Sequence, residues 1–123
     1  MEHPTLPDGE LEIMQIVWDN APPVSRSTIE QALGEERQLA PSTILTFLSR
    51  LCDKGFLSVT HRGRANLYTP RISRRDYLAG ESRRALDRLF GGSVSALAVS
   101  LCDSGLTKAE LAELRQLLEE DAL

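Results

Sequence analysis

The period of the hydrophobic pattern changes within one short stretch of this 123-residue chain, and that change limits the folds available to it. Before residue 55 and after residue 72, apolar side chains recur at the three- and four-residue intervals of amphipathic helices. Between residues 57 and 69, two short runs alternate between polar and apolar side chains, as paired strands do. A glycine-containing stretch of hairpin length, residues 61–65, separates these runs. The chain is therefore predicted to be mostly α-helical with one small β-hairpin.

Local start and stop signals divide the first helical part into three helices. Asp8 is expected to cap the first helix and Ser25 the second, because both side chains accept hydrogen bonds from free N–H groups. Pro41 suits the first position of a third helix, and Gly55 suits its end. Residues 1–7, which contain two prolines, are expected to form a loose arm.

Three helices followed by a hairpin give the order of a winged helix-turn-helix, which is predicted over residues 1–71. Its third helix, residues 41–54, is the expected recognition helix, and residues 57–70 are the expected wing. Trp18 is expected in the core beneath the third helix. The side chains on the apolar arc of that helix are Ile44, Phe47, Leu48 and Leu51.

Residues 72–123 are expected to form further helices, opened by the capping residues Ser73, Ser93 and Thr107. About 50 residues are too few to enclose a core, yet this segment carries a stripe of leucines. The segment is therefore predicted to be a helical dimerisation region, and the protein a homodimer. The side chains expected in the dimer contact are Tyr77, Leu78, Leu86, Leu89, Phe90, Leu97, Leu101, Leu111, Leu114 and Leu118.

Basic residues are concentrated in the predicted recognition helix and wing, although the net charge of the chain is −4. Residues 41–75 carry seven basic side chains and one acidic, whereas both flanking segments are net acidic. Such a stretch is typical of a nucleic-acid contact, so the predicted partner is double-stranded DNA. Hydroxyls and guanidinium groups can reach phosphates or base edges, and Leu45 can meet a thymine methyl group. The residues expected at the DNA are Ser42, Thr43, Leu45, Thr46, Ser49, Arg50, Lys54, Arg62 and Arg64.

The sequence favours neither an enzyme nor a metalloprotein. It has two histidines and none of the usual zinc-protease, phosphate-loop or nucleophile-elbow motifs, so no catalytic residue and no cofactor is predicted. Cys52 and Cys102 lie 50 positions apart, which suits neither a metal knuckle nor a disulfide framework. No apolar run approaches the ~20 residues that span a bilayer, and no signal peptide is recognisable. The expectation is a cytoplasmic protein that does not insert into membranes.

Two other functions stay open at this stage. Leu45 on the outer face of the third helix, near Asp53, also suits a winged-helix adaptor that docks on a partner protein. Cys52 or Cys102 also suits a regulator that senses redox state or a small ligand. A salt titration of duplex binding separates a DNA-binding protein from an adaptor, because counterion release gives a steep negative slope.

Several stretches of the chain, taken in order and spacing, resemble the penicillinase-repressor family, which includes repressors of β-lactamase, methicillin-resistance and copper operons. The resemblance covers nearly all of residues 5–120. The similar stretches are residues 11–18, 41–44, 50–55, 63–70, 77–78, 81–82, 89–93 and 106–118.

The resemblance implies a dimeric winged-helix repressor on an inverted-repeat operator near a promoter. By the same resemblance, Thr43, Thr46 and Arg50 contact the groove and its phosphates. Arg62 and Arg64 are placed on the wing side. The family also implies a membrane-bound sensor metalloprotease as a partner, which cuts the repressor between its dimerisation helices.

The chain departs from the family pattern at positions that bear on affinity and release. Ser42 and Asp53 stand where members carry basic residues, so the expected operator affinity is modest and salt-sensitive. Ser100-Leu101 stands where the scissile Asn-Phe pair of the resistance repressors falls. Release by proteolysis and release by another signal therefore both remain open.

Overall fold

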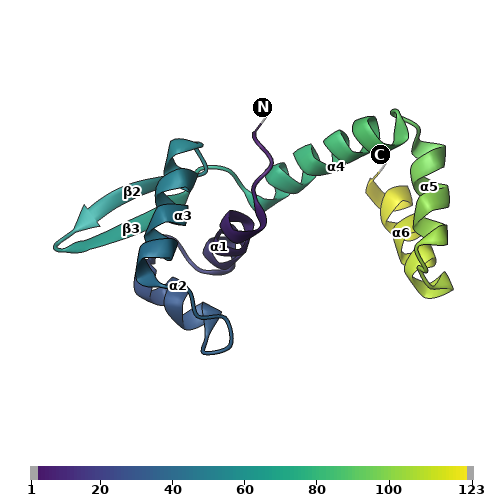
Figure 1. The fold of residues 1–123 in the computed structure, drawn as a ribbon. Coiled ribbons are helices and arrows are strands. Elements are labelled where there is room, and N and C mark those ends of the chain that lie inside the picture. Colours follow the sequence, from purple (N-terminus) through teal and green to yellow (C-terminus); the bar gives the residue numbers. More distant parts are fainter. Residues whose placement is uncertain (1–2, 122–123) are drawn as a thin grey trace. The chain divides into compact units, whose positions relative to one another are not determined.

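The computed structural model describes residues 3–121, which form six helices and one three-stranded sheet (Figure 1). The mostly helical class with a small hairpin is thereby confirmed. The helices of the first part are α1 (Asp8–Asp19), α2 (Arg26–Leu33) and α3 (Pro41–Asp53). The strands are β1 (Val24–Ser25), β2 (Leu57–Arg62) and β3 (Ala65–Pro70). The later helices are α4 (Arg74–Phe90), α5 (Val94–Asp103) and α6 (Lys108–Asp121).

The chain divides into two compact units, and the division falls within α4, between Glu81 and Ser82. The first unit holds α1 to α3, the sheet and the start of α4. Its core confirms the predicted apolar arc of α3, because Ile44, Leu48 and Leu51 are fully buried and Phe47 is half-buried. The other core residues are Leu6, Ile13, Met14, Val17, Val24, Ile29, Phe56, Leu57, Tyr68 and Tyr77.

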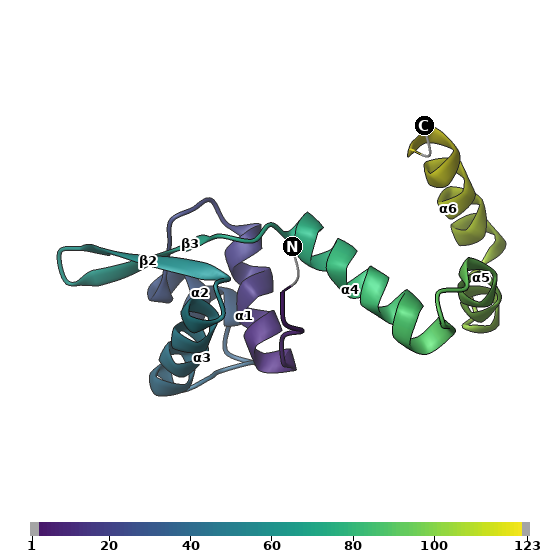
Figure 2. The same cartoon turned by 90° about the horizontal axis from the view of Figure 1, so that it is seen from above.

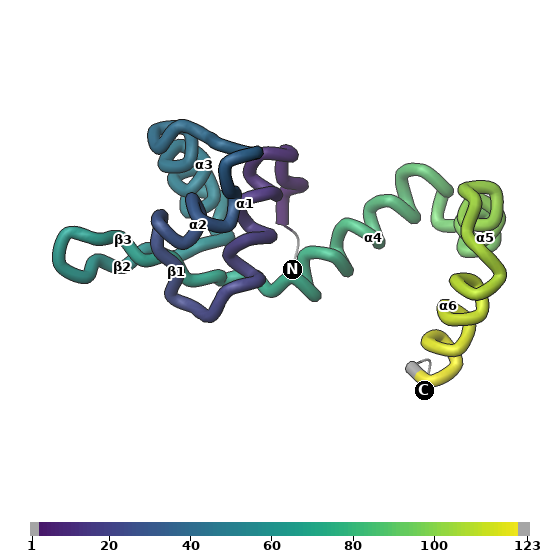
Figure 3. Tube along the Cα trace, turned by 90° about the horizontal axis from the view of Figure 1, so that it is seen from below, coloured from purple at the N-terminus to yellow at the C-terminus, as the bar shows by residue number. Residues whose placement is uncertain are grey.

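The strands lie in the order β1-β3-β2, and both neighbouring pairs are antiparallel. The hairpin of β2 and β3 extends away from the helices of the first unit (Figure 2). It is longer than predicted, because Arg62 still pairs with Ala65 and the connection shrinks to Gly63 and Arg64. Gly63 has a φ of +64°, as the first central residue of a type II′ hairpin turn requires. Strand β1, which the tube in Figure 3 shows before α2, was not predicted, since two residues are too few to display a period.

The predicted helix caps are confirmed where a serine or threonine side chain opens the helix. Ser25, Ser73 and Ser93 each accept a hydrogen bond from the backbone N–H three residues later, at 3.2, 3.0 and 3.1 Å. Thr107 and Glu110 form both hydrogen bonds of a capping box, at 2.9 and 3.1 Å. These caps succeed as predictions because their partners lie within three residues of the same chain segment.

The expectation of a loose arm at residues 1–7 is wrong for the described residues from His3 onward. His3 and Leu6 are 7% and 4% exposed. The Leu6 N–H donates to the Tyr77 hydroxyl at 3.0 Å, and the Thr5 hydroxyl donates to the Glu81 carboxylate at 3.0 Å. This arm therefore packs against the first turns of α4.

Helix α1 also begins differently from the prediction. Pro7 occupies the capping position without a side-chain hydrogen bond, and Asp8 is the first helical residue. Asp8 therefore does not cap the helix. Its carboxylate instead lies in the first turn, where it favours the positive end of the helix dipole.

Two aromatic side chains lie elsewhere than expected. Tyr77 was predicted in the dimer contact, but it is 3% exposed and packs edge-on against Phe56, with ring centroids 5.6 Å apart. Its side chain therefore belongs to the core of the first unit and has almost no surface left for a second copy. Trp18 is half-buried beside Tyr77 rather than beneath α3, and its indole N–H donates to the Ile72 carbonyl at 2.9 Å.

The second unit contains the end of α4 together with α5 and α6. None of its described residues is fully buried. The large exposed apolar side chains are Leu89, Val94, Val99, Leu114, Leu117 and Leu118. Within residues 3–121, no single helix has the length and apolar character to cross a membrane; α4 and α5, bent at their junction, reach them only as a pair.

Candidate nucleic-acid interface

The outer face of α3 is polar apart from one leucine. Helical periodicity turns this face away from the buried arc, so its side chains meet solvent. Thr43 is half-buried at its edge, and the exposed members are Ser42, Leu45, Thr46, Ser49 and Arg50. The Thr46 hydroxyl donates to the Ser42 carbonyl at 2.9 Å, so its proton is directed to its own helix. The Thr46 oxygen keeps acceptor capacity.

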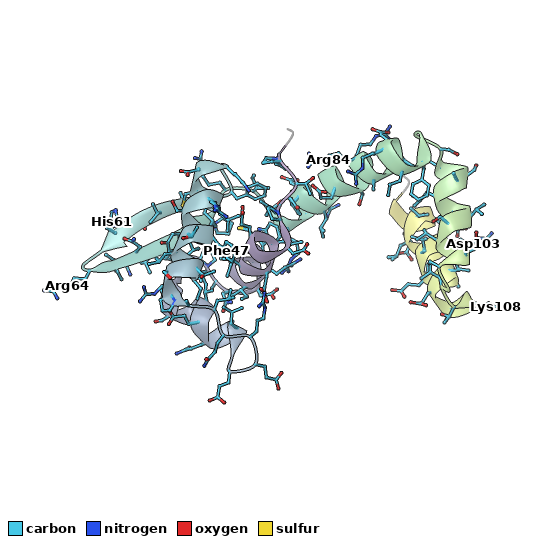
Figure 4. All side chains as sticks on the ribbon, in the orientation of Figure 1. Phe47, His61, Arg64, Arg84, Asp103 and Lys108 are labelled. Atoms are coloured by element: carbon cyan, nitrogen blue, oxygen red, sulfur yellow. The ribbon has the colours of Figure 1, made fainter. Side chains whose placement is uncertain are left out.

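The tip of the hairpin carries two exposed arginines, Arg62 and Arg64, one on each side of Gly63. Figure 4 shows Arg64 at the far end of the hairpin and His61 on the strand behind it. His61 and Asn66 are opposite each other in the register, and the His61 Nδ1 lies 2.5 Å from the Asn66 carboxamide oxygen. This cross-strand contact supports the hairpin close to its arginines.

A groove brings the recognition helix and the wing onto one surface of the first unit. Leu45 of α3 lines it together with Arg64 of the wing. The other residues that line it are Ser25, Arg26 and Ser27 at the start of α2, and Ala65, Asn66 and Tyr68 of β3. An extended polyanion lying along this groove meets α2, α3 and the wing together.

Most arginines near this surface have no acid to neutralise them. Among the described residues, no ion pair is made by Arg50, Arg62, Arg64, Arg71 or Arg75. By contrast, Arg74 pairs with Asp19 at 2.6 Å. The free positive charge of the first unit is therefore found on the outer face of α3, on the wing and beside the start of α4.

Lys54 does not belong to that free charge, although the sequence placed it among the DNA contacts. Its ammonium group is ion-paired with Glu10, which is 2% exposed. A buried carboxylate requires a compensating charge, so this lysine stabilises the contact between α1 and the end of α3. Its charge is already balanced and is not available to a phosphate.

Three polar residues of the groove were missed by the sequence analysis. Arg26 and Ser27 directly follow the helix cap Ser25, and Asn66 follows from the hairpin register. The cap signal alone locates the first turn of α2 but not its proximity to the wing. Arg26 is ion-paired with Glu30 at 3.2 Å, so its positive charge is partly compensated.

The two cysteines lie in different units and are both free. Burial, and secondarily the neighbouring Asp53 carboxylate, raises the pKa of the Cys52 thiol above its ordinary value. A raised pKa lowers the thiolate fraction that oxidants attack, which argues against Cys52 as a redox sensor. Cys102 is exposed in α5. Among the described residues, no three His, Cys, Asp or Glu side chains form a metal-binding group.

Comparisons with known proteins agree with this arrangement. The family model described as penicillinase repressor matches residues 6–120. A 16.5 kDa protein of Latilactobacillus sakei, encoded in the ptsI 3′ region, is 31% identical over 115 residues, 93% of this chain and 78% of its own length. The methicillin resistance regulatory protein MecI of Mammaliicoccus sciuri is 25% identical over 113 residues, 91% of each chain.

Two solved structures share the fold of the first part of the chain. The solution structure of the DNA-binding domain of the repressor BlaI has 34% sequence identity and a TM-score of 0.54. The solution structure of monomeric Bacillus licheniformis BlaI in complex with the blaP half-operator has 34% identity and a TM-score of 0.52. Each similarity covers 62% of this chain and 92% of the BlaI chain.

Proposed function

Because this chain belongs to the penicillinase repressor family, we propose that it is a transcriptional repressor that binds an inverted-repeat operator as a homodimer. The observation that carries the proposal is the set of unpaired arginines on α3 and the wing, joined by the groove behind Leu45. The similarity to BlaI, solved on its half-operator, supports the same use of this surface. The protein acts on cytoplasmic DNA and has no catalytic role.

In the proposed complex, α3 lies in a major groove, which is about 12 Å wide and admits a helix. Arg50 reaches a guanine edge or a phosphate from the exposed face of α3. Arg62 and Arg64 bind the neighbouring sugar-phosphate backbone or minor groove from the hairpin tip. Ser42, Thr43 and Ser49 supply hydroxyls to phosphates or base edges, while Thr46 acts as an acceptor.

The second unit is the proposed dimer contact. Its α6 presents a shallow apolar groove lined by Leu111, Leu114 and Leu118, with Arg115 and Glu119 at its border. Exposed leucines lose contact with water when a second copy covers them, which favours association. A dimer of this kind spaces its half-sites by about 34 Å, or by a small multiple of that distance.

Release of the operator is proposed to follow disruption of that contact, by a sensor protease or by another signal. Ser100 and Leu101 lie inside α5 and are half-buried, so a protease acting between them must first unwind the end of that helix. Mass spectrometry of the chain recovered from induced cells tests this step. A fragment ending at Ser100 supports proteolysis, whereas an intact chain under induction assigns release to another signal.

The experiment that tests the function is genomic footprinting followed by a salt titration of the bound duplex. If Arg50, Arg62 and Arg64 of both subunits each neutralise a phosphate, log K falls with log salt with a slope of about −5. A scrambled duplex of equal length is the control, and it should bind more weakly at every salt concentration. No protected genomic site and a flat salt dependence would reject the repressor and favour the adaptor.

A further inference from the structure

One apolar side chain occupies the middle of the polar face of α3. Leu45 is 40% exposed, and its helical neighbours on that face are Ser42 at i−3 and Ser49 at i+4. The adjacent Thr46 donates its hydroxyl proton to the Ser42 carbonyl. The surface around Leu45 is therefore apolar at its centre, and one of its hydroxyl donors is already used.

The groove beside Leu45 indicates what this side chain faces in a complex. Arg64 lines it on the wing side and Arg26 lines it at the start of α2. In protein–DNA complexes, cations at the border of a site hold the phosphates and fix the register of the helix. Because Leu45 lies on α3 between these cations, a duplex held by them presents base edges, rather than phosphates, to it.

Only one base offers an apolar group in the major groove, namely thymine through its C5-methyl group. A leucine satisfies neither the donors nor the acceptors of guanine, adenine or cytosine, and each of those groups loses water without compensation beside it. We propose that Leu45 is a specificity-determining residue that reads the C5-methyl group of one thymine in each half-site. This inference rests on the proposed function and adds to it the identity of one base.

The test removes that methyl group without altering the hydrogen bonds of the base. A duplex is first selected by the full-length protein from a random library, and each thymine of one half-site is then replaced by deoxyuridine. Fluorescence anisotropy at constant salt measures each dissociation constant. The wild-type chain should bind about fourfold more weakly at one position, the loss expected for one buried methyl group. Placing 5-methylcytosine there should bind more tightly than cytosine does.

Variants show whether Leu45 makes the distinction. Leu45→Ala should bind the thymine and uracil duplexes equally at that position, and Leu45→Met should retain part of the difference. Arg64→Ala is the matched control, because it should weaken both duplexes by the same factor and leave their ratio unchanged. Indifference of the wild-type chain to every replacement, or an unchanged ratio in Leu45→Ala, would overturn the inference and leave the repressor function standing. Failure to select any duplex would reject both.

Discussion

The ammonium group of Lys54, which follows the last residue of α3, is ion-paired with the buried carboxylate of Glu10 in α1. Replacing Lys54 by Met leaves that carboxylate without a compensating charge. The free energy of unfolding should fall by about 2 kcal/mol, less than for a fully buried pair because Lys54 is 30% exposed. Urea denaturation measures this loss, and Glu10→Gln combined with Lys54→Met should recover most of it.

The same variant separates a structural role of Lys54 from a DNA contact. Because its charge is already balanced, Lys54→Met should leave the salt slope of operator binding unchanged. Lys108→Met, at the exposed first residue of α6, is the control for stability. A slope flatter by about 1 would return Lys54 to the DNA contacts.

Two glycines in helices should respond oppositely to alanine. A Cβ at Gly9 would lie 2.7 Å from the Phe47 ring, so Gly9→Ala forces α1 and α3 apart and should destabilise by about 1 kcal/mol. A Cβ at Gly80 meets no atom within 4 Å, so Gly80→Ala should stabilise α4 by about 0.5–1 kcal/mol. Thermal denaturation of the two variants compares them directly. Equal shifts of Tm would contradict the close approach of α1 and α3.

Arg50 and Arg64 should contribute to binding in different ways. Arg50→Ala should cost roughly 1–3 kcal/mol on the operator and less on unrelated DNA, since a groove contact depends on sequence. Arg64→Ala should weaken all sequences alike and reduce the salt slope by about 1. Arg37→Ala is the control, because Arg37 lies between α2 and α3 and pairs with Glu12 at 3.0 Å. Unchanged anisotropy curves for Arg50→Ala and Arg64→Ala would place the interface elsewhere.

The apolar groove of α6 should decide the oligomeric state. Leu114→Glu puts a charge on the surface that a second copy is proposed to cover, so the dimer should dissociate at concentrations where the wild-type chain associates. Gln116→Glu adds the same charge outside the residues that line the groove and should have little effect. Sedimentation velocity gives the dissociation constants. A monomeric wild-type chain would refute the dimer directly.

The raised pKa of Cys52 predicts a pH dependence of both reactivity and stability. The folded chain holds the thiol proton more tightly than the unfolded chain. Its contribution to stability is therefore complete below the ordinary thiol pKa and is lost as the pH rises through the folded pKa. Iodoacetamide alkylation of Cys102→Ser, which leaves Cys52 as the one thiol, should have its midpoint at higher pH when folded than in urea. An equal or lower midpoint would contradict burial of the thiol.

Features that depend on neighbours in sequence were predictable here. The serine caps, the exposed and buried arcs of α3 and the hairpin all follow from local chemistry or from periodicity. The exposure of Ser42, Leu45 and Arg50 follows from the same arcs, whereas their contacts with DNA stay predictions.

Features that depend on distant contacts were not predictable. The burial of Leu6 rests on Tyr77, 71 residues away, and no local pattern indicates that hydrogen bond. The pairing of Lys54 with Glu10 spans 44 residues, so the count of basic side chains in residues 41–75 could not show which charges were already neutralised. The groove likewise joins α2, α3 and β3, three elements whose proximity is a property of the folded unit.

The separation of charge also determines how a duplex and the protein meet. With a net charge of −4, the protein as a whole repels a polyanion at long range, while the unpaired arginines of α3 and the wing attract it. Misaligned collisions are therefore discouraged before contact, and the productive orientation is selected during diffusion. The protein consequently trades encounter frequency for alignment, and added salt erodes the speed of capture before it shortens the lifetime of a completed complex.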